Sequence, residues 1–235
     1  MRLPILLSVP HAGLRVPDEV AAWCILPPDE VARDGDEFAA EIYDLAPDVT
    51  GFVTTDVARA IVDLNRAEDD RRKDGVVKTH TCWDVPVYRQ PLPDRVVELL
   101  LHSYYRPYHA TLTAWADGRV RVGIDCHTMA AVGPPVGPDP GAERPWVCLS
   151  NGDGTCPAQW MTGLHACFAA QFEGRVRVND PFRGGHITRT HATEMPWIQL
   201  ELSRAPFLSP AEKRARVRRA LAAWVEGGSG PSRLP

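Results

Sequence analysis

Two histidines stand at the ends of short apolar runs, where they could bind a metal ion. His11 follows the run ILLSVP directly, and Gly13 allows a sharp turn that leaves the imidazole exposed at a sheet edge. His127 follows VGIDC, with Asp125 two positions before it. A neutral imidazole is a common zinc ligand, and a carboxylate beside it can fix its tautomer. A lone histidine in such a place is more often structural or solvated than a metal ligand.

Glu201 interrupts the apolar run IQLEL. A carboxylate buried there without a partner would be strongly disfavoured, so it requires a compensating interaction. Beside a metal-bound water, a glutamate can act as the general base and later protonate a leaving nitrogen. The alternative is a structural ion pair with Arg59 or Arg66. The residue types therefore favour either metal-dependent hydrolysis or a buried salt bridge.

Two further segments carry groups suited to carboxylate or carbonyl ligands. DLNR at 63–66 places a carboxylate, an amide and a guanidinium within four residues, and arginine can bind a carboxylate through two parallel hydrogen bonds. PFRGGHITRTH at 181–191 has two adjacent glycines and four basic side chains, Arg183, His186, Arg189 and His191. These groups could hold an acidic substrate. A strand-end turn and a tight hairpin with solvated charges are the structural alternatives.

Other catalytic motifs are missing from the sequence. It contains no G-x-S-x-G elbow, no P-loop, no H-E-x-x-H and no strand-following G-x-G-x-x-G. Cys126 and His127 are adjacent, but neighbours on a strand face opposite sides and make a poor nucleophile and base. Metal-dependent hydrolysis is the chemistry that remains.

Composition limits the class of partner. The 235 residues carry a formal net charge of -4 and the pI is near 6.1, which argues against binding to a nucleic-acid backbone. No apolar run approaches the roughly 20 residues of a membrane helix, and the first apolar stretch is too short for a signal peptide. We therefore expect a soluble cytoplasmic protein that binds a small molecule, with no membrane or nucleic-acid partner.

The elements that must position these residues are short apolar runs alternating with longer helical patterns, which is typical of an α/β fold with a largely parallel, buried sheet. Strands are predicted at Ile5–Val9, Gly51–Thr55, Ala60–Leu64, Val120–Cys126, Trp146–Leu149, Val176–Val178 and Trp197–Leu202. Helices are predicted at about Asp36–Leu45, Asp94–Ala116 with a break near Pro107, Ala158–Phe172 and Pro210–Val225. Because ligands bind outside the carboxyl ends of strands in such sheets, the polar residues can converge there.

Three other segments complete the organisation. Ser209, Pro210 and Glu212 form a capping-box signal for the start of the last helix. Residues 133–145 are rich in Pro and Gly, which predicts a lid or binding loop, with disorder as the alternative. No linker or repeat divides the chain, so we expect one domain over residues 1–228 and a flexible tail at 229–235.

With these residues identified, the sequence resembles the N-formylglutamate amidohydrolase family over most of its length. The motifs that carry the resemblance are, in order, SVPHAG at 8–13, RDGDEFAAEIYD at 33–44, ARAIVDLNR at 58–66, YYRPYH at 104–109, GIDCHTM at 123–129, NDPFRGGHITR at 179–189 and IQLELSR at 198–204. Singly most of these motifs are weak, but seven in one order are hard to obtain by chance.

This family is similar in turn to the zinc carboxypeptidases and aspartoacylase. The similarity implies a three-layer α/β/α fold with a mixed, largely parallel central sheet and one zinc ion per chain, with His11 and His127 as ligands. The H-x-x-E spacing of those relatives is not kept, because Leu14 stands three residues after the first histidine. The third ligand is therefore expected from RDGDEF. Asp36 is chosen there, with Asp34 and Glu37 as alternatives.

The resemblance also implies roles in amide hydrolysis. Glu201 would be the general base and acid, and Arg66 would stabilise the oxyanion. The residues expected to bind substrate are Arg59, Asn65, Arg183, Arg189 and His191. The expected reaction is zinc-dependent hydrolysis of an N-acyl amino acid, above all N-formyl-L-glutamate to glutamate and formate. The alternatives are a zinc carboxypeptidase or peptide amidase with a longer groove, and a non-catalytic binding homologue.

Overall fold

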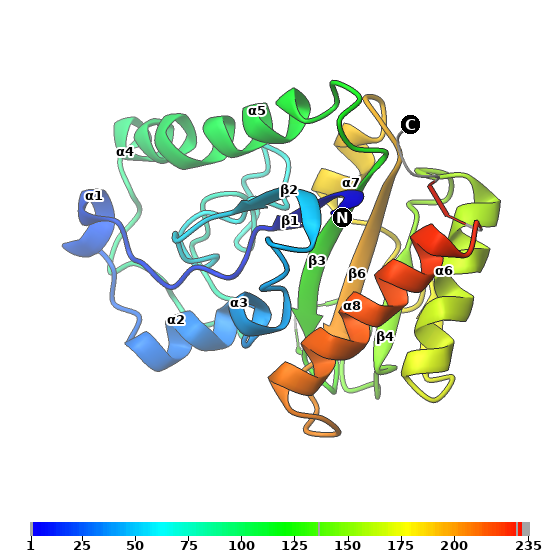
Figure 1. The fold of residues 1–235 in the computed structure, drawn as a ribbon. Coiled ribbons are helices and arrows are strands. Elements are labelled where there is room, and N and C mark those ends of the chain that lie inside the picture. Colours follow the sequence, from blue (N-terminus) through cyan, green and yellow to red (C-terminus); the bar gives the residue numbers. More distant parts are fainter. Residues whose placement is uncertain (1, 136, 229, 232–235) are drawn as a thin grey trace.

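A six-stranded sheet forms the centre of the molecule in the computed structural model, which describes residues 2–135, 137–228 and 230–231. The strands are β1 (Leu3–Val9), β2 (Val49–Thr54), β3 (Val122–Met129), β4 (Val147–Ser150), β5 (Val176–Val178) and β6 (Trp197–Ser203). Their spatial order is β2-β1-β3-β6-β4-β5 (Figure 1). Neighbours are parallel except β4 and β6, which are antiparallel. The predicted mixed, largely parallel α/β sheet is confirmed.

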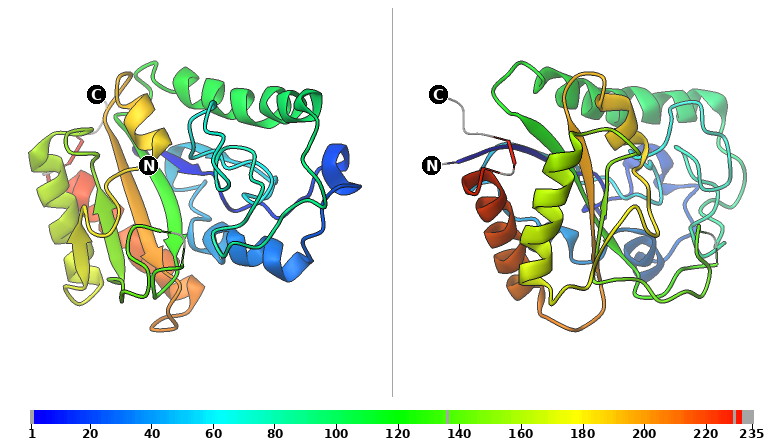
Figure 2. Two further views of the ribbon diagram at one scale, coloured as in Figure 1. Left: turned by 180° about the vertical axis from the view of Figure 1, so that it is seen from behind. Right: turned by 90° about the vertical axis from the view of Figure 1, so that its right-hand side faces the viewer.

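Helices cover both faces of this sheet (Figures 1 and 2). The helices are α1 (Asp18–Ala21), α2 (Pro28–Asp34), α3 (Ala39–Ile42), α4 (Asp94–Leu100), the π-helical η1 (Leu101–Tyr105), α5 (Arg106–Ala114), α6 (Ala158–Gln171), α7 (His186–His191) and α8 (Pro210–Glu226). Side chains of α3, α6 and α8 share one apolar core with the sheet. Side chains of α4, η1, α5 and α7 share a second core on the opposite face. The sheet is therefore the middle of three layers.

The central strands carry apolar side chains on one face and polar side chains on the other. In β3, Ile124 and Cys126 belong to the core shared with α6 and α8, whereas Asp125 and His127 alternate with them and face the other way. In β6, Glu201 alternates in the same manner with its apolar neighbours. The polar residues on this face lie near the carboxyl ends of the parallel strands. Ligands bind at this end of the strands in α/β sheets.

One predicted strand is wrong. The segment Ala60–Leu64 is buried, as its apolar residues suggest, but its backbone forms turns. The N–H groups of Ile61 and Val62 both donate to the carbonyl of Ala58, at 2.9 and 3.2 Å. A short apolar run predicts burial well but does not distinguish a strand from other buried backbone. β3 also extends beyond its predicted end, so His127 lies within the strand and not after it.

Two predicted helices differ from the structure. The helix expected over Asp36–Leu45 is reduced to α3, because Phe38 has a left-handed backbone with φ 66° immediately before it. The helix expected over Asp94–Ala116 exists, and its irregularity is the π-helical η1 that ends just before Arg106 and Pro107. Proline lacks the N–H that an α-helix interior requires, which explains an altered turn there.

The capping box predicted for the last helix is confirmed, whereas the lid predicted at 133–145 stays a prediction. Ser209 and Glu212 form the reciprocal capping box that begins α8. In the loop 133–145, of which residue 136 is not described, Arg144 binds Asp139 through two hydrogen bonds of 2.8 and 2.6 Å. Across the described part of the chain, every helix is too short or too polar to span a lipid bilayer. The tail predicted at 229–235 lies outside the described residues, apart from 230 and 231.

Candidate active site

The parallel pairing of β1, β3 and β6 brings the polar residues of three distant segments to one edge of the sheet. Asp125 is the register partner of Ser8 in β1 and of Gln199 in β6. Two residues further along the same two strands, His127 is paired with Glu201. His11 lies two residues beyond the end of β1. The chain connections therefore place both histidines and Glu201 side by side, as their positions at strand ends predict.

A buried group of three possible metal ligands forms at this edge, made of His11, Asp36 and His127. The Nδ1 atoms of the two histidines are 3.2 Å apart. Oδ2 of Asp36 lies 3.0 Å from Nδ1 of His127 and 3.5 Å from Nδ1 of His11. Nitrogen and oxygen ligands in a tetrahedral zinc site lie about 3.3 Å from one another. The donor types and their spacing therefore fit a zinc ion.

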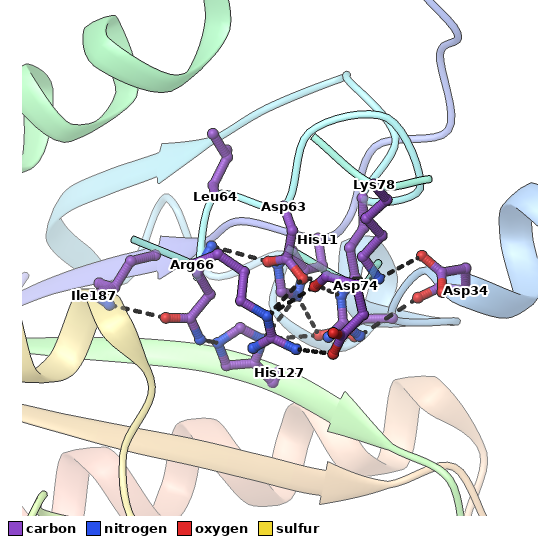
Figure 3. A network of polar contacts seen from close by, with 12 residues as sticks. His11, Asp34, Asp63, Leu64, Arg66, Asp74, Lys78, His127 and Ile187 are labelled. Carbon is purple, nitrogen blue, oxygen red and sulfur yellow. Dashed lines mark hydrogen bonds and ion pairs between the residues drawn. The ribbon is translucent and has the colours of Figure 1, made fainter. Parts of the chain in front are cut away.

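The outer nitrogens of both imidazoles lie close to carboxylates, and Figure 3 shows the contact between His11 and Asp63. Nε2 of His11 lies 2.9 Å from Oδ1 of Asp63, and Nε2 of His127 lies 3.0 Å from Oδ2 of Asp125. The latter oxygen is buried and has no hydrogen bond of suitable geometry among the described residues. A metal ion on Nδ1 would leave the ring proton on Nε2, 3.0 Å from this oxygen, although the angle at Nε2 in this structure does not suit a hydrogen bond. The carboxylate of Asp125 is thus close enough to favour a cation at this imidazole through its charge.

The backbone around Asp36 explains why this residue, and neither neighbouring acid, reaches the histidines. Its N–H donates to the carbonyl of His11 at 3.2 Å, and its carboxylate accepts from the N–H of Thr128 at 3.1 Å. Asp34 instead binds the ammonium of Lys78 at 2.9 Å. Glu37 points toward solvent and pairs with Arg204 at 3.3 Å. The structure brings Asp36 alone of the three acids into the group.

The Asp34–Lys78 pair supports a testable prediction about stability. Both side chains are fully buried, and Asp34 also accepts from the N–H of Cys82. Replacing Lys78 with methionine leaves a buried carboxylate without its cation, so the free energy of unfolding should fall by about 3–5 kcal/mol. Urea denaturation of the metal-free protein measures this change. In the control Lys73→Met, which removes an exposed pair with Asp84, the loss should not exceed about 1 kcal/mol; equal losses would contradict the prediction.

The carboxylates in and around the His11–Asp36–His127 group favour a positive charge at its centre. Burial acts to raise the pKa of Asp36, but the neighbouring His11 outweighs it and holds that pKa well below the ordinary value. Burial opposes charge on His127, yet Asp125 raises the pKa of this imidazole well above the ordinary value. Burial likewise acts to raise the pKa of Asp63, and Arg59 and His11 hold it well below normal. A divalent cation at this point would satisfy the surplus of carboxylates.

Glu201 has the properties of a buried proton carrier. It is 6% exposed and lines the same cavity as the histidines. Its Oε1 accepts a hydrogen bond from the side-chain amide of Gln199 at 2.8 Å, and burial raises its pKa. Among the described residues, Arg59 and Arg66 pair with aspartates and not with Glu201. The structural ion pair considered as the alternative role is therefore not formed.

A cavity of about 290 Å³ opens above the group. Its walls include five arginines, Arg59, Arg66, Arg144, Arg183 and Arg204, together with Asn65 and Gln199. Pro134, Gly137 and Pro138 of the loop 133–145 also line it. Arginines in a partly closed cavity create a positive field that suits a small anion.

Two predicted substrate-binding residues do not line this cavity. The guanidinium of Arg189 donates to the carbonyls of Arg183 and Gly184, both at 2.9 Å, so it shapes the loop behind the cavity wall. His191 is buried between His109 and Glu194. Neither side chain lines the cavity, because sequence proximity to Arg183 does not give the same direction to side chains on α7.

Several contributors were not singled out from sequence. Asp63, within DLNR, orients His11, and Gln199 holds Glu201. Gly185 approaches Asn65 so closely that a Cβ atom would overlap the asparagine amide, and Oδ1 of that amide accepts from the N–H of Ile187 at 2.8 Å. The paired glycines were the sequence signal for this contact. Arg144 gave no comparable signal, because it lies in an irregular loop.

Comparison with known proteins identifies the family of this chain. A family model described as N-formylglutamate amidohydrolase matches residues 3–208. An N-formylglutamate deformylase of Pseudomonas putida is 30% identical over 234 residues, which covers 90% of this chain and 84% of that protein. An N-formylglutamate deformylase of Pseudomonas aeruginosa is 28% identical over 227 residues, covering 88% and 83%.

Two solved structures share the fold. An N-formylglutamate amidohydrolase from Ralstonia eutropha JMP134 has a TM-score of 0.72 at 21% identity, covering 95% of this chain and 91% of that one. A gene product of Agrobacterium tumefaciens has a TM-score of 0.75 at 16% identity, with the same coverage. The family match extends over most of the chain and includes every residue of the metal-ligand group and Glu201. This protein belongs to the N-formylglutamate amidohydrolase family.

Proposed function

We propose that this protein is a zinc-dependent N-formylglutamate deformylase, which hydrolyses N-formyl-L-glutamate to glutamate and formate. The observation that carries the proposal is the buried His11–Asp36–His127 group in an arginine-lined cavity that also contains Glu201. The names of the two Pseudomonas relatives support the choice of substrate.

The metal would be held by His11, Asp36 and His127. When bound, zinc lowers the pKa of a water molecule toward about 7 and polarises a carbonyl oxygen. Three protein ligands are the number found in catalytic zinc sites, which keep a further position open. Asp63 and Asp125 orient the two imidazoles from behind, which is the usual role of carboxylates next to zinc-binding histidines.

Glu201 would move the proton during hydrolysis. Its raised pKa brings the carboxyl group closer to neutral pH, where it can both accept and release a proton. It takes a proton from the attacking water and returns it to the amide nitrogen as the C–N bond breaks, which yields the amino group of glutamate and formate. Asn65 and Arg66, which line the cavity, would donate hydrogen bonds to the carbonyl oxygen as negative charge develops on it.

The cavity arginines would bind the two carboxylates of the substrate. Arg59 and Arg66 already hold aspartates at 3.0 and 3.2 Å. Arg183 is 66% exposed and its contact with Asp153 is longer, at 3.5 Å. Of these three arginines, Arg183 therefore loses least when it leaves its aspartate to bind a substrate carboxylate. Arg59 keeps its aspartate and contributes mainly positive charge to the cavity.

A matched pair of substrates tests this proposal. N-formyl-L-glutamine has nearly the same size as N-formyl-L-glutamate but lacks the second negative charge. Losing a hydrogen-bonded charge should lower kcat/KM by about 10- to 100-fold for the glutamine compound, measured as formate released by the zinc-loaded protein. N-acetyl-L-glutamate and a dipeptide serve as further comparisons. Preferential hydrolysis of the dipeptide would instead support the carboxypeptidase alternative, and no hydrolysis of any compound would reject the proposal.

A further inference from the structure

The YYRPYH segment at 104–109 lies within the part of the chain that the family model matches, and none of its residues lines the cavity. It spans the end of η1 and the start of α5, on the side of the sheet that carries the polar residues. Tyr105 and Tyr108 are buried, and His109 is partly buried. Their polar atoms all bond to residues that lie next to the candidate active site.

Two of these side chains hold the backbone on either side of Asn65. The ring Nε2 of His109 lies 3.0 Å from the carbonyl oxygen of Leu64. The hydroxyl of Tyr105 donates to the carbonyl of Arg66 at 2.8 Å. The two side chains are four residues apart, so a helical backbone presents them on one face, and their rings lie 4.3 Å apart. The helix therefore contacts the DLNR turn at the carbonyls of Leu64 and Arg66.

The DLNR turn needs such support because it is not a strand of the sheet. Its side chains nevertheless contact both histidines: Asp63 lies 2.9 Å from Nε2 of His11, and the amide nitrogen of Asn65 lies 3.1 Å from Nε2 of His127. A rotation of the peptide units at 64–66 would move both side chains. Strand pairing cannot prevent this rotation, whereas hydrogen bonds from a packed helix can.

The direction of the His109 hydrogen bond is fixed by the groups around it. A carbonyl can only accept, so Nε2 of His109 must carry a proton. Burial lowers the pKa of His109 to about 4, so the ring is neutral and its Nδ1 is an acceptor. This Nδ1 lies 2.9 Å from Nε2 of His191, which must donate. Nδ1 of His191 lies 2.9 Å from the Glu194 carboxylate, which can only accept, so both ring nitrogens of His191 donate and its ring carries two protons. Glu194 also accepts from the hydroxyl of Thr113.

We propose that Tyr105 and His109 are positioning residues, which clamp the DLNR turn so that Asp63 stays within hydrogen-bond distance of His11 and Asn65 stays against His127 at the cavity wall. His191 and Glu194 hold His109 in the single tautomer that can bond to Leu64. This assigns His191 a place in the support of the turn, in contrast to the substrate contact expected from sequence. The catalytic part of the test depends on the proposed function, whereas its metal-binding and spectroscopic parts do not.

The test compares zinc affinity and turnover in four variants. His109→Leu removes both hydrogen bonds and should lower zinc affinity and kcat by about 10- to 100-fold, as loss of residues that orient metal ligands does. In His109→Gln the amide can donate to Leu64 and accept from His191, so most of the loss should be restored. Tyr105→Phe removes the hydrogen bond to the carbonyl of Arg66 and should also lower zinc affinity. His102→Leu changes an exposed histidine on the same helical segment and should have no effect.

A spectrum of the wild-type protein provides a readout that does not depend on activity. In ¹⁵N-correlated NMR of the metal-free protein at neutral pH, His109 should show one neutral tautomer with the proton on Nε2. A proton on Nδ1, or exchange between tautomers, would overturn the proposal. Wild-type zinc affinity in His109→Leu would do the same.

If His109→Leu does not fold, the proposal is decided by the zinc affinities of His109→Gln and Tyr105→Phe together with the wild-type spectrum. If the wild-type protein does not hydrolyse N-formyl-L-glutamate, the proposed function fails, and zinc affinity with the tautomer decides this inference separately.

Discussion

Replacing Glu201 with glutamine is expected to lower kcat by about 10²- to 10⁴-fold, which is the usual contribution of a general acid and base. Glutamine keeps the size of the side chain and can still accept the hydrogen bond from Gln199. It cannot take a proton from water or give one to the leaving nitrogen. Because Glu201 is outside the metal-ligand group, the variant should still bind zinc with an affinity similar to that of the wild-type protein.

Two measurements on the same preparation make this prediction decisive. Zinc content is measured by elemental analysis, and turnover is followed as formate release from N-formyl-L-glutamate. Glu98→Gln is the matched control, since it alters an exposed carboxylate on α4 that pairs with Arg106. Near-normal turnover in Glu201→Gln would remove this residue from the mechanism. Loss of zinc together with activity would show that Glu201 supports the metal site instead.

His11→Ala and His127→Ala are each expected to abolish zinc retention. The wild-type protein should hold about one zinc ion per chain, as catalytic zinc sites with three protein ligands do. Each substitution removes one of three ligands and leaves the partner carboxylate, Asp63 or Asp125, buried without its imidazole. The purified variants should therefore contain almost no zinc after dialysis and show no measurable hydrolysis.

The control for this experiment is His102→Ala, which removes an exposed imidazole. It should retain the zinc content and activity of the wild-type protein. Circular dichroism of all three variants checks that they are folded, since metal loss through unfolding would carry no information about ligation. Folded His11→Ala and His127→Ala proteins with a full complement of zinc would contradict the proposed ligand set.

The sequence predicted the parts of the site that depend on strand geometry. His11, Asp125, His127 and Glu201 all lie at or near the carboxyl ends of strands, and the parallel order of β1, β3 and β6 brings such positions together. Alternation along each strand determines which residues share a face, and this pattern can be read directly from sequence. The sheet class followed from the same alternation of short apolar runs and helical patterns.

The parts that could not be predicted depend on irregular backbone. Ala60–Leu64 has the composition of a buried strand, but it forms the turn that carries Asp63 and Asn65. Asp36 is one of three neighbouring acids, and its approach to the histidines depends on irregular backbone before α3, where its N–H donates to the carbonyl of His11. Neither conformation has a periodic sequence pattern. Side-chain direction outside regular elements follows from tertiary packing, which a single sequence does not contain.

The alternation of apolar and polar residues along β3 limits which genetic changes this gene can tolerate. A codon inserted before Ile124 would shift the strand by one residue, and every side chain beyond it would move to the opposite face. Cys126 would then face the cavity, and His127 would be forced among the apolar side chains of α6 and α8. Substitutions along this strand can be compensated one at a time, but an in-frame insertion or deletion cannot. Length variation among functional relatives should therefore be confined to the loops between strands.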